Sequence, residues 1–215
     1  KNKNVILSVD LGSSPQKKFS SDYQSGALSF EIFFNNCKLI SNCGYFQNYK
    51  HQLNSISKST ATHSTLIVDN RSSCKMKKET DGIFKVDDEI KVIKKSIVSE
   101  KKYWNISGSH DGYLKKYGVI HEREIEFFVE KNKFIGKDKL IKNKKFKSSN
   151  FEVRFHFEPG VKITKTQDGK SILIELENSG WKFSCKDHKI DVETGLYFGK
   201  KNSFVENQNI FISGL

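Results

Sequence analysis

The feature that most constrains the fold of this chain is a succession of short segments in which apolar and polar residues alternate. Side chains two positions apart share a face, as they do in a β-strand that is buried on one side. Turn residues separate the segments, and no stretch shows a helical period over four turns. Strands are expected at residues 5–10, 27–34, 38–43, 64–69, 90–98, 119–130, 133–141, 151–158, 161–166, 171–177, 181–185, 196–199 and 208–213.

Two of the intervening turns have a recognisable chemistry. Asp168 and Gly169 lie between two alternating runs, a pair that predicts a two-residue type I′ hairpin turn. Asn35 and Asn36 suit a similar turn because asparagine tolerates positive φ. Turns this short join antiparallel neighbours, so the sheets are expected to be antiparallel.

The length and the aromatic content allow a large core. The chain has 215 residues and 17 phenylalanines, each of which can bury a large area. We therefore expect an all-β protein: a large antiparallel β-sandwich of two stacked multi-strand sheets, with little helix, forming a single domain over residues 1–215. No apolar run approaches the roughly 20 residues needed to span a bilayer, and the opening residues 1–4 begin no segment resembling a signal peptide.

The charge balance is strongly basic but does not favour nucleic acid. The formal net charge is +12, yet the arginines are only Arg71, Arg123 and Arg154, and every other cation is lysine. Proteins that read nucleic acid usually enrich arginine for bidentate contacts. An acidic polysaccharide suits the same positive field equally well, and charge alone does not choose it.

The four cysteines show no metal-binding or redox spacing. Cys37, Cys43, Cys74 and Cys185 form no C-x-x-C pair and no zinc-finger pattern with histidine. Cys37 and Cys43 lie too far apart along one strand to form a disulfide. Buried reduced thiols are the favoured interpretation.

Several histidines lie in patterns that allow two readings. The segment His110–Tyr113 is either a site loop or, as we favour, a turn with Asp111 and Gly112 at its apex. Arg154 and His156 alternate with apolar residues and so share the polar face of a strand, which is either solvated or in contact with substrate.

The remaining histidines are assigned structural or surface roles. His121 and Arg123 share a strand face with three apolar residues, which predicts a buried polar pair. His51 and His188 fit no pattern and are expected at the surface.

Four blocks in a fixed order resemble the heparinase II/III-like polysaccharide lyases. "SGALSFEIFFNNCKLISNCG" resembles the family segment H-x-H-A-D-A-L-S-F-E…L-L-V-D-P-G, and "STATHSTLIVDN" resembles S-T-x-A-H-N-T-V-V-V-D. "SHDGYLKKYGVIHERE" and "FEVRFHFEPGV" match the later HDGY…HxR and RFHLxPGV segments. The resemblance is to the C-terminal β-sheet domain of the family. It implies that an N-terminal α/α toroid, absent from this chain, is the partner domain.

The resemblance implies an activity on acidic polysaccharides. Such lyases cleave uronate-containing polysaccharides by β-elimination, in which a base removes the C5 proton and an acid protonates the departing O4. In the family the helical domain supplies most of the acid and base groups, so this domain alone is expected to be inactive. The bacterial periplasm or cell envelope is the compartment that the resemblance suggests.

Aligning the shared "ALSFE" carries the family's site positions onto this chain. The two histidines of H-x-H fall at Asp22 and Gln24, and the aspartate of V-D-P-G falls at Asn42. The aspartate of A-D-A falls at Gly26, whereas the histidine of A-H-N-T is retained as His63. Some members hold zinc with the second histidine, the V-D-P-G aspartate and a later histidine.

The substitutions lead us to expect no zinc, no other cofactor and no confident catalytic residue. Amides are poor substitutes for the carboxylate and imidazole ligands of zinc. One interpretation of Gln24 and Asn42 is a polar cluster in which their amides hydrogen-bond His63 in place of a metal. His63 itself either bridges loops, the favoured interpretation, or faces the groove. The candidates for a substrate groove are Asp22, Tyr23, Gln24, Asn42, His63, Arg154 and His156.

Three functions of different kinds are compatible with these residues. The chain is the β-sheet domain of a lyase that acts on acidic polysaccharide, or a non-catalytic domain that binds acidic glycans after losing the histidine and metal site, or a structural support for the helical domain. The second is favoured by the residues at Asp22, Gln24 and Asn42.

Overall fold

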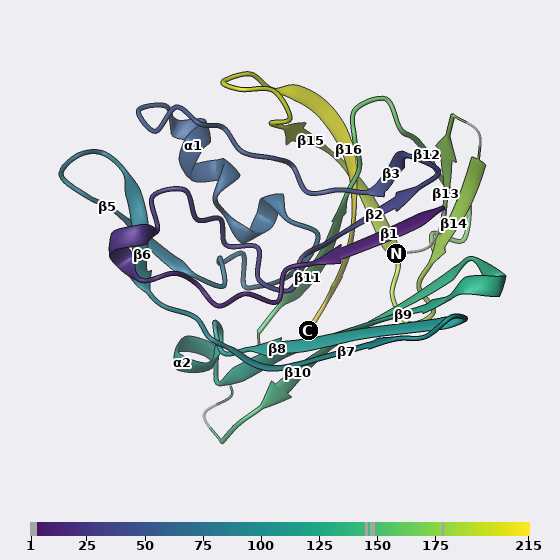
Figure 1. The fold of residues 1–215 in the computed structure, drawn as a ribbon, viewed down its shortest axis with the longest axis horizontal. Helices are drawn as coiled ribbons and strands as arrows, with labels where there is room; N and C mark the ends of the chain where they lie inside the picture. The colour runs from purple at the N-terminus through teal and green to yellow at the C-terminus, as the bar shows by residue number, and fades with distance from the viewer. Residues whose placement is uncertain (1–3, 145, 147–148, 178) are drawn as a thin grey trace.

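The chain folds into short antiparallel strands with very little helix. The computed structural model describes residues 4–144, 146, 149–177 and 179–215 (Figure 1), so most of the opening segment 1–4 lies outside it. The strands are β1 (Val5–Val9), β2 (Phe30–Phe34), β3 (Cys37–Ile40), β4 (Leu66–Val68), β5 (Lys75–Lys78), β6 (Phe84–Asp88), β7 (Val92–Ser99), β8 (Tyr103–His110), β9 (Val119–Phe128), β10 (Lys133–Lys142), β11 (Phe151–His156), β12 (Lys162–Lys165), β13 (Ser171–Leu176), β14 (Ser179–Ser184), β15 (Ile190–Tyr197) and β16 (Val205–Gly214).

Hydrogen bonding groups the described strands into five sheets. Their orders are β1-β2-β3, β10-β9-β8-β7, β15-β16-β11-β4, β12-β13-β14 and β5-β6. In Figure 1 the sheet of β7 to β10 runs along one side of the molecule, and β1 to β3 lie above it. The predicted large antiparallel β-sandwich is confirmed, although its layers are divided into several sheets rather than two continuous ones.

One apolar core joins four of these sheets. It includes Ile32 of β2, Ile125 of β9, Ile172 of β13 and Ile210 of β16, each at most 3 % exposed. Along β9 the buried and half-buried residues alternate without a break over all ten positions. The period-2 pattern of the sequence therefore has its expected cause, because one face of each strand packs on this core.

The helical elements are short. They are α1 (Gln52–Ser57), α2 (Leu114–Tyr117) and the 3₁₀ turns η1 (Lys17–Phe19), η2 (Thr60–Thr62) and η3 (Val129–Lys131). In the described part of the chain, no helix is long and apolar enough to cross a bilayer.

The sequence patterns missed β5, β6, β8 and most of β15. The hairpin of β5 and β6 carries charged residues on a largely exposed surface, so it shows little alternation of hydrophobicity. Strand β8 is rich in asparagine, serine and glycine, which are not typical of strands. It is a strand because β7 and β9 pair with it on both sides.

The two predicted hairpin turns differ in outcome. Asn35 and Asn36 both have positive φ, at 48° and 65°, as a type I′ turn requires. In the other turn Gly169 has positive φ, whereas Asp168 does not, and the Gly169 N–H donates to the carbonyl of Thr166. The type I′ prediction there was wrong, because the β12–β13 loop is longer and needs a left-handed residue only at Gly169.

The Asn35–Asn36 turn gives a first prediction. Asn36→Val should lower the free energy of unfolding by about 1–2 kcal/mol, because a β-branched residue is strained at positive φ. Urea denaturation would measure the change. Asn36→Gly is the matched control and should be neutral or stabilising. Equal stability of the valine and glycine variants would contradict the prediction.

All four cysteines are free. Cys43 and Cys74 are buried, as expected for reduced thiols, whereas Cys37 and Cys185 are half-buried. The prediction of buried thiols is thus confirmed for two of the four.

Candidate functional site

The strand entrances singled out in the sequence meet at one surface depression of about 540 Å³. The segment before β2 contributes Asp22, Tyr23 and Gln24 to its lining. Asn42, just after β3, and His63, just before β4, complete this set. A larger cavity of about 850 Å³ lies between α2 and β6 and includes none of these five residues.

His63 is the most buried of the five, with 6 % of its surface exposed. It follows η2, and its Nδ1 lies 2.9 Å from the carbonyl oxygen of Ser59. A carbonyl can only accept, so Nδ1 carries the proton and Nε2 keeps its lone pair. Burial lowers the pKa of His63 to about 4, despite the bond to Ser59. The side chain is therefore a neutral imidazole that both bridges to the Ser59 backbone and lines the depression.

Gly26 makes room for the His63 ring. A Cβ at this position would lie 2.6 Å from Cδ2 of His63 and 3.1 Å from its Nε2. The resemblance places Gly26 where the family has an aspartate. The structure thus shows that the imidazole fills the space that a side chain at position 26 would need.

Gly26→Ala should displace the imidazole. We expect it to lower the free energy of unfolding by about 1–3 kcal/mol, because overpacking a buried contact forces neighbouring groups to move. Denaturant titration would measure the loss, and the NMR resonances of His63 should shift. Gly136→Ala is the matched control, since nothing lies within 4 Å of a Cβ there. Equal effects of the two substitutions would contradict the prediction.

Gln24 and Asn42 do not hold the imidazole. The Asn42 Oδ1 accepts the N–H of Ser64 at 2.8 Å, and the Asn42 N–H donates to Glu31 at 3.0 Å. Among the described residues no hydrogen bond joins either amide side chain to His63. The interpretation of these amides and the imidazole as a polar cluster is therefore wrong. The Asn42 side chain instead accepts the backbone N–H of Ser64, just before β4.

The same contacts show whether these residues could hold the zinc ion that some members of the family bind. Oδ1 of Asn42 is occupied by a backbone N–H, and Gln24 offers a neutral amide. In the part of the chain that the structure describes, no group of three or more His, Cys, Asp or Glu side chains is placed to hold a metal ion. The donors present at Gln24, Asn42 and His63 do not fit zinc.

Carboxylates that the sequence reasoning did not single out also line the depression. They come from Asp10, after β1, and from Glu31 in β2. Burial raises the pKa of Asp10, and the N–H of Gly12 partly opposes this rise. Lys38 supplies a cation, with its Nζ 3.6 Å from Glu31. Glu31 is the single charged residue between the apolar residues of β2, and this pattern could have identified it as a candidate. The position of Asp10 could not be predicted in this way, because it depends on the pairing of β1 with β2.

Two tyrosines lie close to Asp22: Tyr45 contacts it, and Tyr23 is the next residue in the lining of the depression. Tyr45 donates a hydrogen bond to exposed Asp22 at 3.2 Å. The Tyr23 hydroxyl is buried without a hydrogen-bond partner, and burial raises its pKa. Tyr23 is thus a neutral phenol near neutral pH and has no basic character.

Arg154 and His156 do not line this depression. His156 is 1 % exposed, with Nδ1 2.8 Å from Oδ1 of Asn209 and 3.1 Å from Sγ of Cys43. Burial lowers its pKa to about 4. Arg154 is half-buried and pairs with Glu152 at 2.7 Å and with Glu193. The expectation of a solvated or substrate-facing pair was wrong for His156, because Asn209 of β16 covers it.

The structure agrees with the predictions for residues 110–113, for His121 and for His51. Residues 111–113 form a turn that leads into α2, as favoured, although His110 and Tyr113 are buried. His121 and Arg123 are the buried polar pair expected on β9, at 0 % and 3 % exposure. His51 is exposed and caps α1 by accepting the N–H of Leu53.

His188 is covered more than expected. It is half-buried and packs edge-on against Phe151, at 5.7 Å between ring centroids.

The fold and the depression define an antiparallel β-sandwich domain whose strand entrances form one polar surface site. The chain belongs to the heparinase II/III-like C-terminal family, which matches residues 1–215. The suspected resemblance is thereby confirmed. None of the curated proteins matches the chain.

Solved lyase structures share this fold. The structure of the heparan sulfate lyase HepC from Pedobacter heparinus matches 99 % of this chain with a TM-score of 0.77 and 14 % identity. The heparinase III-BT4657 gene product matches 89 % with a TM-score of 0.68 and 16 % identity. The chain spans 31 % and 27 % of the length of those two proteins.

Proposed function

We propose that this chain is the β-sheet domain of a polysaccharide lyase that acts on uronate-containing polysaccharide by β-elimination. In this proposal the depression contacts the saccharide, and the acid and base that carry out the elimination lie outside the described residues. The observation that carries the proposal is the meeting of Asp22, Gln24, Asn42 and His63, the family's site positions, at one depression.

The chemistry of the lining supports a binding role rather than a catalytic one. Elimination needs a base that accepts the C5 proton, and such a base works best with a pKa near the operating pH. His63, with its pKa lowered to about 4, is a weak base, and Tyr23 is a neutral phenol. The lone pair of His63 is suited to accept a hydrogen bond from a sugar hydroxyl.

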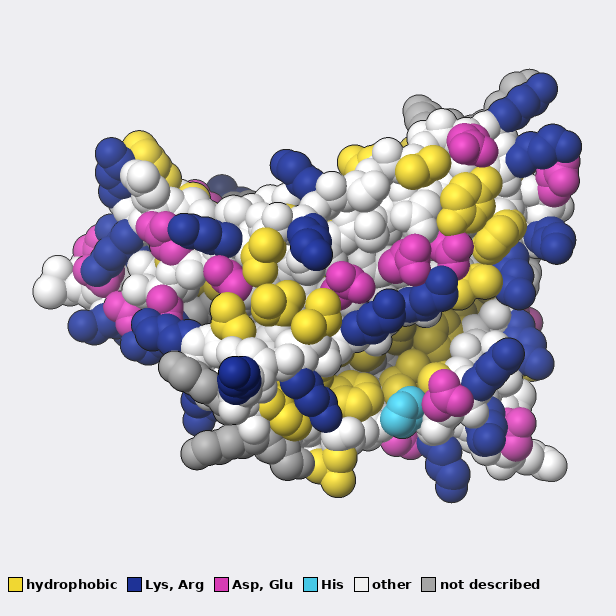
Figure 2. Space-filling view, turned by 90° about the horizontal axis from the view of Figure 1, so that it is seen from below, with side chains coloured by type: hydrophobic (Ala, Val, Ile, Leu, Met, Phe, Trp, Pro, Cys, Tyr) yellow, Lys and Arg dark blue, Asp and Glu magenta, His cyan; other side chains and the backbone are white. Residues whose placement is uncertain are grey.

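The carboxylates restrict how an acidic sugar would lie. Asp10, Asp22 and Glu31 would repel a uronate carboxylate or a sulfate, and Lys38 is the cation beside them. We expect sugar hydroxyls to face these carboxylates, while the anionic groups of the polysaccharide lie toward lysines outside the depression. On the face shown in Figure 2, lysine and arginine side chains are interspersed with carboxylates.

Binding of heparan sulfate oligosaccharides by the 215-residue chain tests the proposal. Isothermal titration at physiological salt should give saturable uptake, and Gln24→Ala should weaken it severalfold because Gln24 lines the depression. Gln167→Ala, in the exposed β12–β13 turn, is the matched control. Dextran sulfate measures non-specific attraction to the net charge of +12. Absence of saturable binding, or equal effects of the two variants, would contradict a saccharide site here.

A second candidate function is a glycan-binding domain in a parent protein that has lost elimination. It is favoured by the side chains at Asp22 and Gln24, which replace both histidines of the family motif. An ultraviolet assay for unsaturated uronide, applied to the complete parent protein, separates the two candidates. Product formation supports the lyase, whereas binding without product supports the glycan-binding domain.

A further inference from the structure

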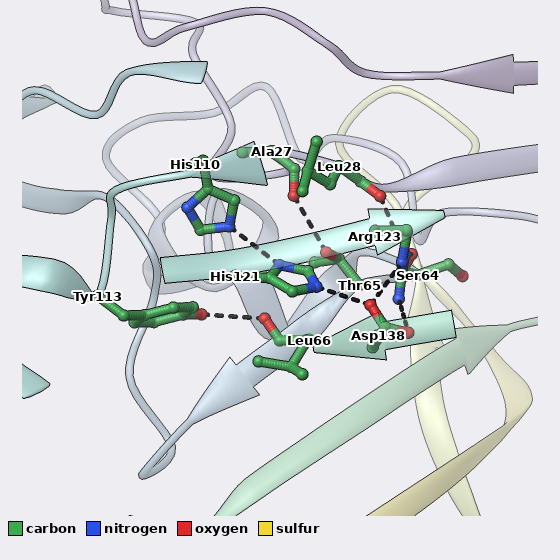
Figure 3. A network of polar contacts seen from close by, with 10 residues as sticks. All are labelled: Ala27, Leu28, Ser64, Thr65, Leu66, His110, Tyr113, His121, Arg123 and Asp138. Atoms are coloured by element: carbon green, nitrogen blue, oxygen red, sulfur yellow. Dashed lines mark hydrogen bonds and ion pairs between the residues drawn. The ribbon is translucent and has the colours of Figure 1, made fainter. Parts of the chain in front are cut away.

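A buried charged cluster is hydrogen-bonded to the two loops that contribute Gly26 and His63 to the depression (Figure 3). Arg123 of β9 donates from Nε to Oδ1 of Asp138 at 2.8 Å and from Nη2 to Oδ2 at 3.1 Å. This is a bidentate pair between adjacent strands, and the register of β9 and β10 sets residues 123 and 138 opposite each other. Arg123 is 3 % exposed, so it is desolvated on every side.

The histidines of the cluster have one consistent set of protons. The N–H of Gly112 donates to Nδ1 of His110 at 3.1 Å, so the proton of neutral His110 is on Nε2. That proton is donated to Nδ1 of His121 at 3.1 Å, and His121 then donates from Nε2 to Asp138 at 2.6 Å. The turn at 110–113 is thus connected to Asp138 through two neutral imidazoles.

The other arm of Arg123 reaches the two loops that form the depression. Nη1 lies 3.0 Å from the carbonyl oxygen of Leu28 and 2.6 Å from that of Ser64. Leu28 has a positive φ of 59°, an unusual conformation for leucine. It lies two residues after Gly26, against which the His63 ring packs. Ser64 follows His63 directly. One guanidinium therefore fixes both sides of the contact between Gly26 and His63.

We propose that Arg123 is the positioning residue of the depression, holding the loop at residues 26–29 and the loop at residues 63–65 at a fixed separation. Its relevance to saccharide binding rests on the proposed function, whereas the positioning itself does not. Arginine suits this role because its planar fork supplies donors in two directions at once, which the single ammonium of lysine does not.

Amide hydrogen exchange and imidazole NMR test this role. Arg123→Lys keeps the buried charge but loses the fork, and we expect the amides of Ser29 and Thr65 to exchange about tenfold faster by local opening. The Nδ1–H resonance of His63 should shift or broaden. A second variant, Arg123→Met with Asp138→Asn, removes both charges together and so avoids an unpaired buried ion. It should show the same two changes.

Ile125→Val is the matched control. Ile125 is the next inward-facing residue of β9 and is equally buried. Removing one methyl group there lowers the global stability but leaves the hydrogen bonds from Arg123 to the two loops in place. It should leave His63 unchanged and speed only those amides that exchange through global unfolding. Unchanged Ser29, Thr65 and His63 signals in both Arg123 variants, or the same changes in Ile125→Val, would overturn the proposal. The NMR result stands whether or not oligosaccharide binds, so a failed binding titration contradicts only the proposed function.

Discussion

Replacing Asp138 with alanine should lower the free energy of unfolding by about 3–5 kcal/mol, the largest loss expected from a single substitution in this chain. The carboxylate accepts bonds from Arg123 and His121, which are both almost fully buried. Without it the guanidinium remains in the interior with no counter-charge. Urea denaturation followed by tryptophan fluorescence would measure the loss.

Two controls locate this effect in the buried cluster. Asp191→Ala removes an exposed partner of Lys165 and should cost less than about 1 kcal/mol, because solvent screens such a pair. The variant that combines Arg123→Met with Asp138→Asn should be more stable than Asp138→Ala, since no unpaired charge remains. If Asp138→Ala and Asp191→Ala destabilised the protein equally, the assigned role of the pair would be wrong.

Acidification should destabilise the protein strongly between about pH 6.5 and pH 4. Burial lowers the pKa of His63 and of His156 from 6.5 to about 4, and it lowers the pKa values of His110 and His121 as well. In this window the unfolded chain binds protons that the folded chain does not, so stability falls as the pH falls. The loss should be on the order of 2–3 kcal/mol for each of His63 and His156 by pH 4.

Denaturant midpoints at several pH values would check this expectation. Asp138 serves as an internal reference, because burial alone would raise its pKa but Arg123 and His121 hold it well below its ordinary value. Its contribution is present above the unfolded pKa near 3.8 and is lost only at lower pH. A midpoint that stays constant from pH 6.5 to pH 4.5 would contradict the assignment of neutral buried histidines.

The buried histidines show where sequence patterns succeed and where they stop. The alternation along residues 119–130 places His121 and Arg123 on the inward face, and the structure confirms it. The alternation along residues 151–158 places His156 on the same strand face as Arg154. It does not reveal that Asn209 covers His156, because that contact depends on the pairing of β11 with β16. Asp138, the carboxylate that bonds both His121 and Arg123, is likewise identified only by the register of β9 and β10.

The sequence alone determined the all-β class, the antiparallel connections and the segments that converge on the depression. The class and the connections follow from period-2 hydrophobicity and from residues that accept positive φ, which are properties of neighbouring residues. The convergence of the segments was implied by the resemblance of the ordered motifs to the family. The tertiary structure decided which groups distant in the sequence meet: the Asn42 side chain and the backbone N–H of Ser64, Gly26 and the His63 ring, and the Arg123 side chain and two backbone carbonyls. Such contacts join residues 22 to 95 positions apart, and only the folded chain brings them within bonding distance.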